Sequence, residues 1–140
     1  MAQSIEEKIA LVKSWFPKEL TSKERYQKLM ELGKKLEELA DNHKHDETFV
    51  EGCQSQVHVH GDLKEGKIYF TGSSDALVTK GLLYILITVY NGEPPQTIIQ
   101  SSPDFMEQLG MEGSLSQNRS NGVMQIFTQM KKIAVKYLNN

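Results

Sequence analysis

Cys53 is the only cysteine in this chain of 140 residues, so any chemistry that needs a thiol depends on it. It lies in the segment 50–57, directly after Gly52 and before a run of mostly polar residues. Glycine adopts backbone angles that other residues avoid, so Gly52 gives the chain freedom just before the thiol. A structural cysteine more often lies in an apolar run. A reactive cysteine needs access and a lowered pKa. The residues favour a thiol on a pliable turn and leave both an inert and a reactive cysteine open.

Composition sets limits on the other classes of function. A single cysteine excludes an internal disulfide and a dithiol redox motif. The net charge of −2 argues against a dedicated nucleic-acid binder. The N-terminus lacks the apolar region of a secretory signal, and the most apolar run, residues 81–90, is too short to span a bilayer. We therefore expect a cytoplasmic protein that does not enter membranes and that forms one domain over residues 1–140.

Two helices are predicted before the cysteine. Ser4 with Glu7, and Thr21 with Glu24, form capping-box patterns, and apolar residues recur at helical spacing after each. The first helix should end before Pro17.

Strands are predicted on both sides of a turn after the cysteine. Residues 57–60 alternate between apolar and polar, residues 61–66 contain turn residues, and residues 68–71 form the second arm of a hairpin. The two valines of the first arm should face the core. A short strand over 48–50 would complete a three-stranded meander.

The rest of the chain is predicted to be helical. Residues 76–90 are apolar nearly all round, which is typical of a helix buried against several neighbours. Short helices are expected over 94–99 and 103–110, and a long amphipathic helix over 118–138. The fold class is therefore α+β, with a small antiparallel sheet of about three strands packed against helices.

The histidines are weaker candidates for functional residues, as metal ligands or general bases. His43 and His45 lie in the polar segment 41–46, but no further ligand follows at metal-site spacing, so a solvated loop is the better interpretation. His58 and His60 should share the face of their strand that points away from the core. We predict no metal site.

Three separated segments resemble one family. E-G-C-Q-S-Q-V at 51–57, G-S-S-D-A-L-V-T-K-G-L at 72–82 and R-S-N-G at 119–122 are similar to SufE, the sulfur-acceptor protein of the Suf iron–sulfur cluster machinery. The resemblance extends over roughly residues 12–135. It implies an IscU-like α+β fold.

The resemblance also implies a function. SufE-type proteins dock on a pyridoxal-phosphate (PLP) cysteine desulfurase of the SufS type, stimulate it, take sulfur from its persulfide and pass it to a cluster scaffold of the SufBCD type. Cys53 would be the acceptor nucleophile, and the protein would carry no cofactor of its own. The family motifs also suggest partner-binding or supporting residues: Glu51, Gly52, Gln54, Asp75, Lys80, Arg119 and Asn121.

Two residues depart from the family pattern. Ser73 replaces the usual acidic residue after the motif glycine, and His58 replaces an aromatic residue on the cysteine strand. Neither affects the thiol, but both bear on local packing or docking.

Two other classes of function compete with a sulfur acceptor. An IscU-type cluster scaffold would share the fold, but it normally offers several thiolates for iron. A cysteine hydrolase would need His58 or His60 as its base, and both should face away from the core. The desulfurase paralogue, the final sulfur acceptor and the formation of a homodimer stay open. So does our expectation that the free protein shelters Cys53.

Overall fold

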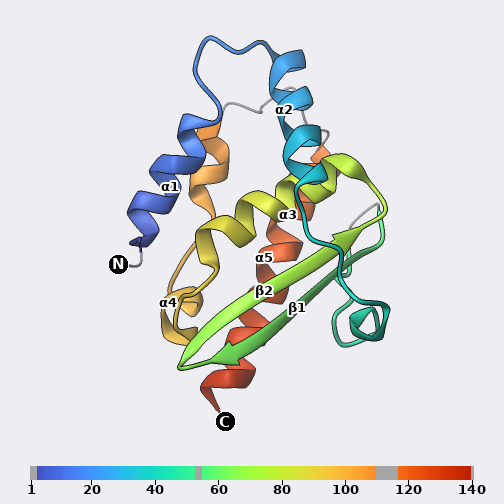
Figure 1. Cartoon of the computed structure of the whole chain (residues 1–140), viewed down its shortest axis with the longest axis vertical. Coiled ribbons are helices and arrows are strands. Elements are labelled where there is room, and N and C mark those ends of the chain that lie inside the picture. Colours follow the sequence, from blue (N-terminus) through green and yellow to red (C-terminus); the bar gives the residue numbers. More distant parts are fainter. Residues whose placement is uncertain (1–2, 53–54, 110–116, 140) are drawn as a thin grey trace.

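The computed structural model describes residues 3–52, 55–109 and 117–139, without the side chains of residues 117–121. Two N-terminal helices precede a hairpin, and further helices follow it (Figure 1). The elements are α1 (Ile5–Ser14), α2 (Ser22–Lys34), η1 (Asp41–His43), β1 (Val57–Lys64), β2 (Lys67–Ser74), α3 (Leu77–Tyr90), α4 (Pro95–Ile99), η2 (Asp104–Leu109) and α5 (Gln117–Leu138). The predicted α+β class is confirmed.

The two N-terminal helices begin where their capping patterns predict. The Glu7 backbone N–H donates to Ser4 Oγ at 3.1 Å, and the Glu7 carboxylate accepts from the Ser4 backbone N–H at 3.2 Å. Thr21 and Glu24 form the same reciprocal pair at the start of α2. These bonds satisfy backbone donors that have no partner within the helix.

The predicted position of the hairpin turn is wrong. Both strands extend to a two-residue turn at Glu65 and Gly66, whose φ angles of 52° and 78° suit a tight hairpin connection. Gly61 instead lies within β1, opposite Phe70. A Cβ atom at Gly61 would lie 2.8 Å from Ile133 Cγ2, so this glycine permits close approach of α5 rather than a turn.

The predicted third strand is also wrong. Phe49 forms only an isolated bridge with His58, flanked by hydrogen bonds of 2.8 Å from Val50 N–H to the Val57 carbonyl and from Val59 N–H to the Thr48 carbonyl. Pairing stops because the chain turns away on both sides of this short contact: it bends at residues 45–48 and turns again at 51–52. The sheet therefore has two strands.

Helix α3 forms the centre of the core, as predicted. It crosses the middle of the molecule and packs against α1, α2, α5 and β2, while α5 also covers β1 (Figure 1). Val57 and Val59 of β1 are fully buried, as expected from their alternation. The short helix expected before α5 is a 3₁₀ helix, η2. No helix in the described residues is long and apolar enough to cross a membrane.

Candidate functional site

The segment that carries the thiol is held at both ends. Cys53 and Gln54 lie outside the described residues, so the site is defined here by its flanks. Before the thiol, Val50 is hydrogen-bonded to the first residue of β1. After it, the Gln56 backbone N–H donates to Asp75 Oδ1 at 3.0 Å, and the Asp75 N–H donates to the Gln56 carbonyl at 3.3 Å. Both flanks of the segment that carries the thiol are therefore fixed by hydrogen bonds.

Gly52 has the conformation that its place before the thiol predicts. Its φ angle is 85°, in the left-handed region that favours glycine. A Cβ atom at this position would lie 3.1 Å from Cγ of Gln125 in α5. Gly52 therefore lies close to the N-terminal half of α5, where a side chain would be crowded.

A chain of hydroxyl groups connects the other flank to α3. The Ser74 hydroxyl donates to Ser55 Oγ at 3.1 Å, and the Ser55 hydroxyl donates to Thr79 Oγ1 at 3.3 Å. The Ala76 backbone N–H donates to Ser74 Oγ, next to the start of the helix. The motif interpretation passed over these three side chains, although all of them lie in the two family segments.

The described candidate residues divide between the loop and the surface beside it. Asp75 fixes the loop base through the Gln56 backbone, and Glu51 is exposed on the loop. Lys80 instead forms an ion pair with Glu38 at 3.4 Å, so its ammonium already has a carboxylate partner. This ion pair links α3 to the segment after α2, and the suggested role of Lys80 in partner binding or support stays a prediction.

Arg119 and Asn121 belong to the beginning of α5, but their side chains lie outside the described residues. Arg119 precedes Gln125 by six residues, which corresponds to about 9 Å along a helix axis. Since Gln125 borders Gly52, this part of α5 lies on the side of the molecule that carries the loop. Their functional roles, like that of Gln54, stay predictions.

The two departures from the family pattern are neighbours across the hairpin. His58 lies directly opposite Ser73 in the register of β1 and β2. The His58 ring is 3.0 Å from Thr48 Oγ1 through Nδ1 and meets the Phe49 ring edge-on, with centroids 5.5 Å apart. Both departures thus concern one cross-strand pair, and His58 also braces the segment before the loop.

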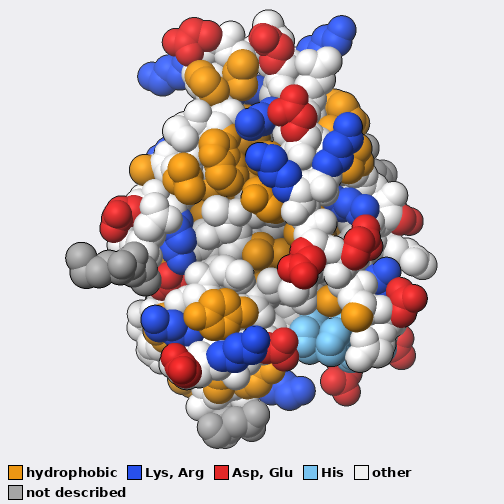
Figure 2. All heavy atoms as spheres, in the orientation of Figure 1, with side chains coloured by type: hydrophobic (Ala, Val, Ile, Leu, Met, Phe, Trp, Pro, Cys, Tyr) orange, Lys and Arg blue, Asp and Glu red, His pale blue; other side chains and the backbone are white. Residues whose placement is uncertain are grey.

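Two other histidines, His43 and His60, contact each other beside β1. The His43 and His60 rings stack with centroids 3.9 Å apart, and His60 Nε2 lies 3.1 Å from Asp62 Oδ1. Figure 2 shows a compact patch of histidine side chains on this face. Within the described residues, no group of three His, Cys, Asp or Glu side chains is arranged to hold a metal ion. Because His58 and His60 already have these neighbours, their use as a general base would require rearrangement.

Comparison with known proteins gives consistent matches over most of the chain. The family model described as "SufE: Fe-S metabolism associated domain" matches residues 10–134. An uncharacterised SufE-like protein of Synechocystis is 38% identical over 129 residues, covering 92% of this chain and 81% of that protein. A solution structure of a hypothetical protein from Thermus thermophilus matches with a TM-score of 0.75 at 25% identity, covering 97% of this chain and 96% of the other.

Two longer relatives have more specific names. The cysteine desulfuration protein SufE of Plasmodium falciparum is 33% identical over 81% of this chain. SufE-like protein 1, chloroplastic/mitochondrial, of Arabidopsis thaliana is 38% identical over the same share. The matched regions span only 48% and 31% of those two proteins. The organellar name of the plant relative leaves our expectation of a cytoplasmic location a prediction.

Proposed function

The chain belongs to the SufE family, and on this basis we propose that it accepts sulfur on Cys53 from the persulfide of a PLP-dependent cysteine desulfurase. The proposal includes stimulation of that desulfurase, of the SufS type, and delivery of the sulfur to a cluster scaffold of the SufBCD type. The protein acts as a carrier and activator and brings no cofactor to the reaction.

One structural observation supports the proposal: the described residues on both sides of the sole thiol are held by hydrogen bonds. Val50 is bonded to Val57 before the thiol, and Gln56 is bonded to Asp75 after it. Because both flanks are fixed, a partner could engage the segment between them without disturbing the hairpin. This arrangement suits a thiol that must meet a sulfur atom inside another protein.

The transfer step needs only a thiolate and a persulfide. The Cys53 thiolate attacks the outer sulfur of the desulfurase persulfide, a new S–S bond forms on Cys53, and the desulfurase cysteine leaves as a thiolate. Sulfane sulfur moves between two cysteines, so no external oxidant or reductant is required. Because the chain has no second cysteine, no neighbouring thiol of the same chain can release the sulfur as sulfide.

The start of α3 lies beside the segment that carries the thiol, and its backbone N–H groups would favour a thiolate there. Thr79, in the first turn of α3, contacts Ser55, and Ser55 follows Cys53 by two residues. Ser55 thus connects the segment that carries the thiol to this helix end. Ala76 at the N-cap has no side-chain capping bond. The positive end of a helix lowers the pKa of a nearby thiol.

Mass spectrometry after incubation with a SufS-type desulfurase, PLP and cysteine tests this function. We expect the mass of the Cys53 peptide to increase by one or more sulfur atoms, and a reducing agent should remove the increase. The Cys53→Ser variant should stay unmodified and should fail to stimulate sulfide release. Undiminished stimulation by this variant would exclude Cys53 as the acceptor.

A further inference from the structure

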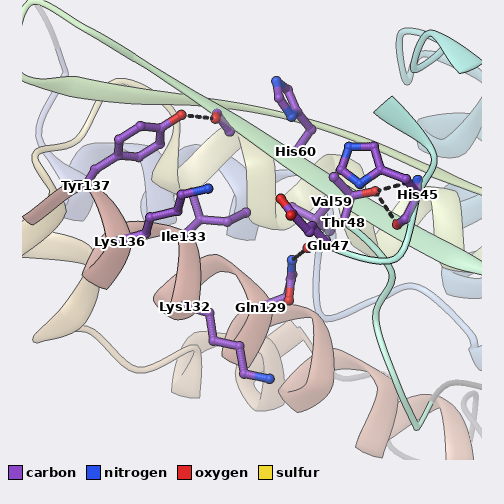
Figure 3. Close-up of a pocket in the computed structure, with 11 residues that line it drawn as sticks. His45, Glu47, Thr48, Val59, His60, Gln129, Lys132, Ile133, Lys136 and Tyr137 are labelled. Atoms are coloured by element: carbon purple, nitrogen blue, oxygen red, sulfur yellow. Dashed lines mark hydrogen bonds between the residues drawn. The ribbon is translucent and has the colours of Figure 1, made fainter. Parts of the chain in front are cut away.

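A cavity of about 390 Å³ lies between β1, the segment before it and the C-terminal half of α5 (Figure 3). Its lining includes the partly buried Ile133 and two buried residues of β1, Val59 and Gly61. Two hydrogen bonds join the surrounding elements: Tyr137 donates to the Gly61 carbonyl at 2.7 Å, and the Gln129 side chain donates to the Glu47 carbonyl at 2.9 Å. The cavity is separate from the loop that carries Cys53, and its size is typical of sites for small ligands.

Two exposed side chains of opposite charge, Lys136 and Glu47, border this cavity. Figure 3 shows the Lys136 ammonium and the Glu47 carboxylate directed into the same space, one from α5 and one from the segment before β1. Neither side chain forms an ion pair or hydrogen bond with another residue in the described ranges. Lys132 lies on the rim and points away from Glu47 (Figure 3).

This arrangement favours a ligand that carries both charges. A simple anion would meet Lys136 but would be repelled by Glu47, and a simple cation would meet the reverse situation. A free α-amino acid carries a carboxylate and an ammonium group on one carbon atom, and charge-assisted hydrogen bonds to both are stronger than neutral ones. Its side chain would then lie against Ile133, a half-buried apolar residue of the lining.

We propose that this cavity is a binding site for a free α-amino acid, held by Lys136 through its carboxylate and by Glu47 through its ammonium group. The site does not depend on the sulfur-acceptor function, because none of its residues belongs to the Cys53 loop. Phosphate and carboxylate ions share the negative charge of the ligand but lack its ammonium group. Their binding therefore distinguishes an amino-acid site from a site for any anion.

Nuclear magnetic resonance titration of the whole ¹⁵N-labelled protein tests the proposal with L-alanine, L-cysteine, L-methionine, acetate, ethylamine and inorganic phosphate. At least one amino acid should produce saturable shifts of the Gly61, Ile133 and Lys136 amides. Acetate and ethylamine should bind at least about tenfold more weakly, because each lacks one charge-assisted contact.

Isosteric variants identify the two contacts. Lys136→Gln and Glu47→Gln should each weaken amino-acid binding about tenfold or more. Phosphate should bind Glu47→Gln at least as well as the unchanged protein. Lys132→Gln removes the same charge from the same helix and should leave the affinity within about twofold. The proposal is overturned if no amino acid gives saturable shifts, if acetate binds as tightly as the amino acids, or if Lys132→Gln weakens binding as much as Lys136→Gln.

Discussion

Gly52 and Gly66 both have positive φ angles, but their surroundings differ. A Cβ atom at Gly66, in the hairpin turn, would have no atom within 4 Å. At Gly52 it would lie 3.1 Å from Gln125 Cγ. The backbone angle alone therefore restricts position 66, whereas position 52 is restricted by both the angle and the contact between the cysteine loop and α5.

Alanine substitutions at these two positions should distinguish the effect of backbone strain from the effect of displacing the cysteine loop. Gly52→Ala and Gly66→Ala should each lower the free energy of unfolding by about 1–2 kcal/mol, because alanine is strained in the left-handed region. Only Gly52→Ala should also reduce sulfur transfer to Cys53, since it displaces the loop from α5. Urea denaturation measures the first effect, and the rate of persulfide formation measures the second. A loss of transfer in Gly66→Ala equal to that in Gly52→Ala would contradict this reasoning.

At the scale of elements, α2 and α3 meet at two glycines. A Cβ atom at Gly81 would overlap the Leu29 carbonyl oxygen, and one at Gly33 would overlap the Leu77 carbonyl oxygen. Without side chains at these positions, the two helix backbones come into direct contact. The glycine of the T-K-G-L motif is thereby explained by packing, at the cost of lower helix propensity at that residue.

Gly81→Ala should be one of the most destabilising single-methyl additions in this chain. The overlap involves backbone atoms rather than the end of a flexible side chain, so α2 and α3 must separate. We expect a loss of about 3 kcal/mol in the free energy of unfolding, at the upper end for overpacking. Gly66→Ala is the matched control, with strain but no overlap. Thermal denaturation followed by circular dichroism decides the matter: equal losses in both variants would show that the crossing tolerates a methyl group.

Element prediction succeeded where one local rule determines the structure. The capping boxes at Ser4 and Thr21 place both N-terminal helices, and the apolar composition of α3 predicts its burial. It failed at glycines, which occur in turns, in strands and at helix crossings alike. Gly61 suggested a turn but lies in a strand beside α5, and Gly81 gave no sign of the helix crossing. Such contacts depend on residues distant in sequence, so local patterns do not reveal them.

At the scale of the whole molecule, the family motifs identified only part of the site. Residues 51–57 and 72–82 meet because Gln56 and Asp75 pair at the loop base, which local patterns did not predict. The hydroxyl chain of Ser55, Ser74 and Thr79 was missed because serine and threonine are common in loops and helix starts. The family motifs predicted the position of the cysteine segment. The residues of β2 and α3 that hold it became visible only in the structure.

Charge reversal tests which end of the hairpin docks on the desulfurase. Transfer requires two sulfur atoms to meet, so the interface must surround the loop that contains Glu51. Glu51→Lys should weaken the complex mainly through a slower, salt-dependent association rate. Glu65→Lys makes the same change at the turn, about 25 Å away along strands of 8 residues. Surface plasmon resonance at two salt concentrations measures both variants. An effect of Glu65→Lys but not of Glu51→Lys would place the interface elsewhere.

The free protein is expected to shield the Cys53 thiol from small thiols in solution. The supports of the loop are buried: Val50 before the thiol, and Ser74 and Thr79 beside its other flank. A carrier benefits from such surroundings, because small thiols would otherwise remove the sulfur before delivery. Docking must then favour an open form of the loop, and it can do so only by binding that form more tightly.

Alkylation rates of Cys53 measure this equilibrium directly. Iodoacetamide should react with the free protein more slowly than with a model thiol at the same pH. Addition of a catalytically inactive desulfurase should increase the rate if docking opens the loop. Gly52→Ala, which disturbs the contact with Gln125, should react faster than Gly66→Ala even without the partner. Reaction of the free, unchanged protein at the full model-thiol rate would mean that Cys53 is permanently presented, and protection of the persulfide would then have to come from the desulfurase surface.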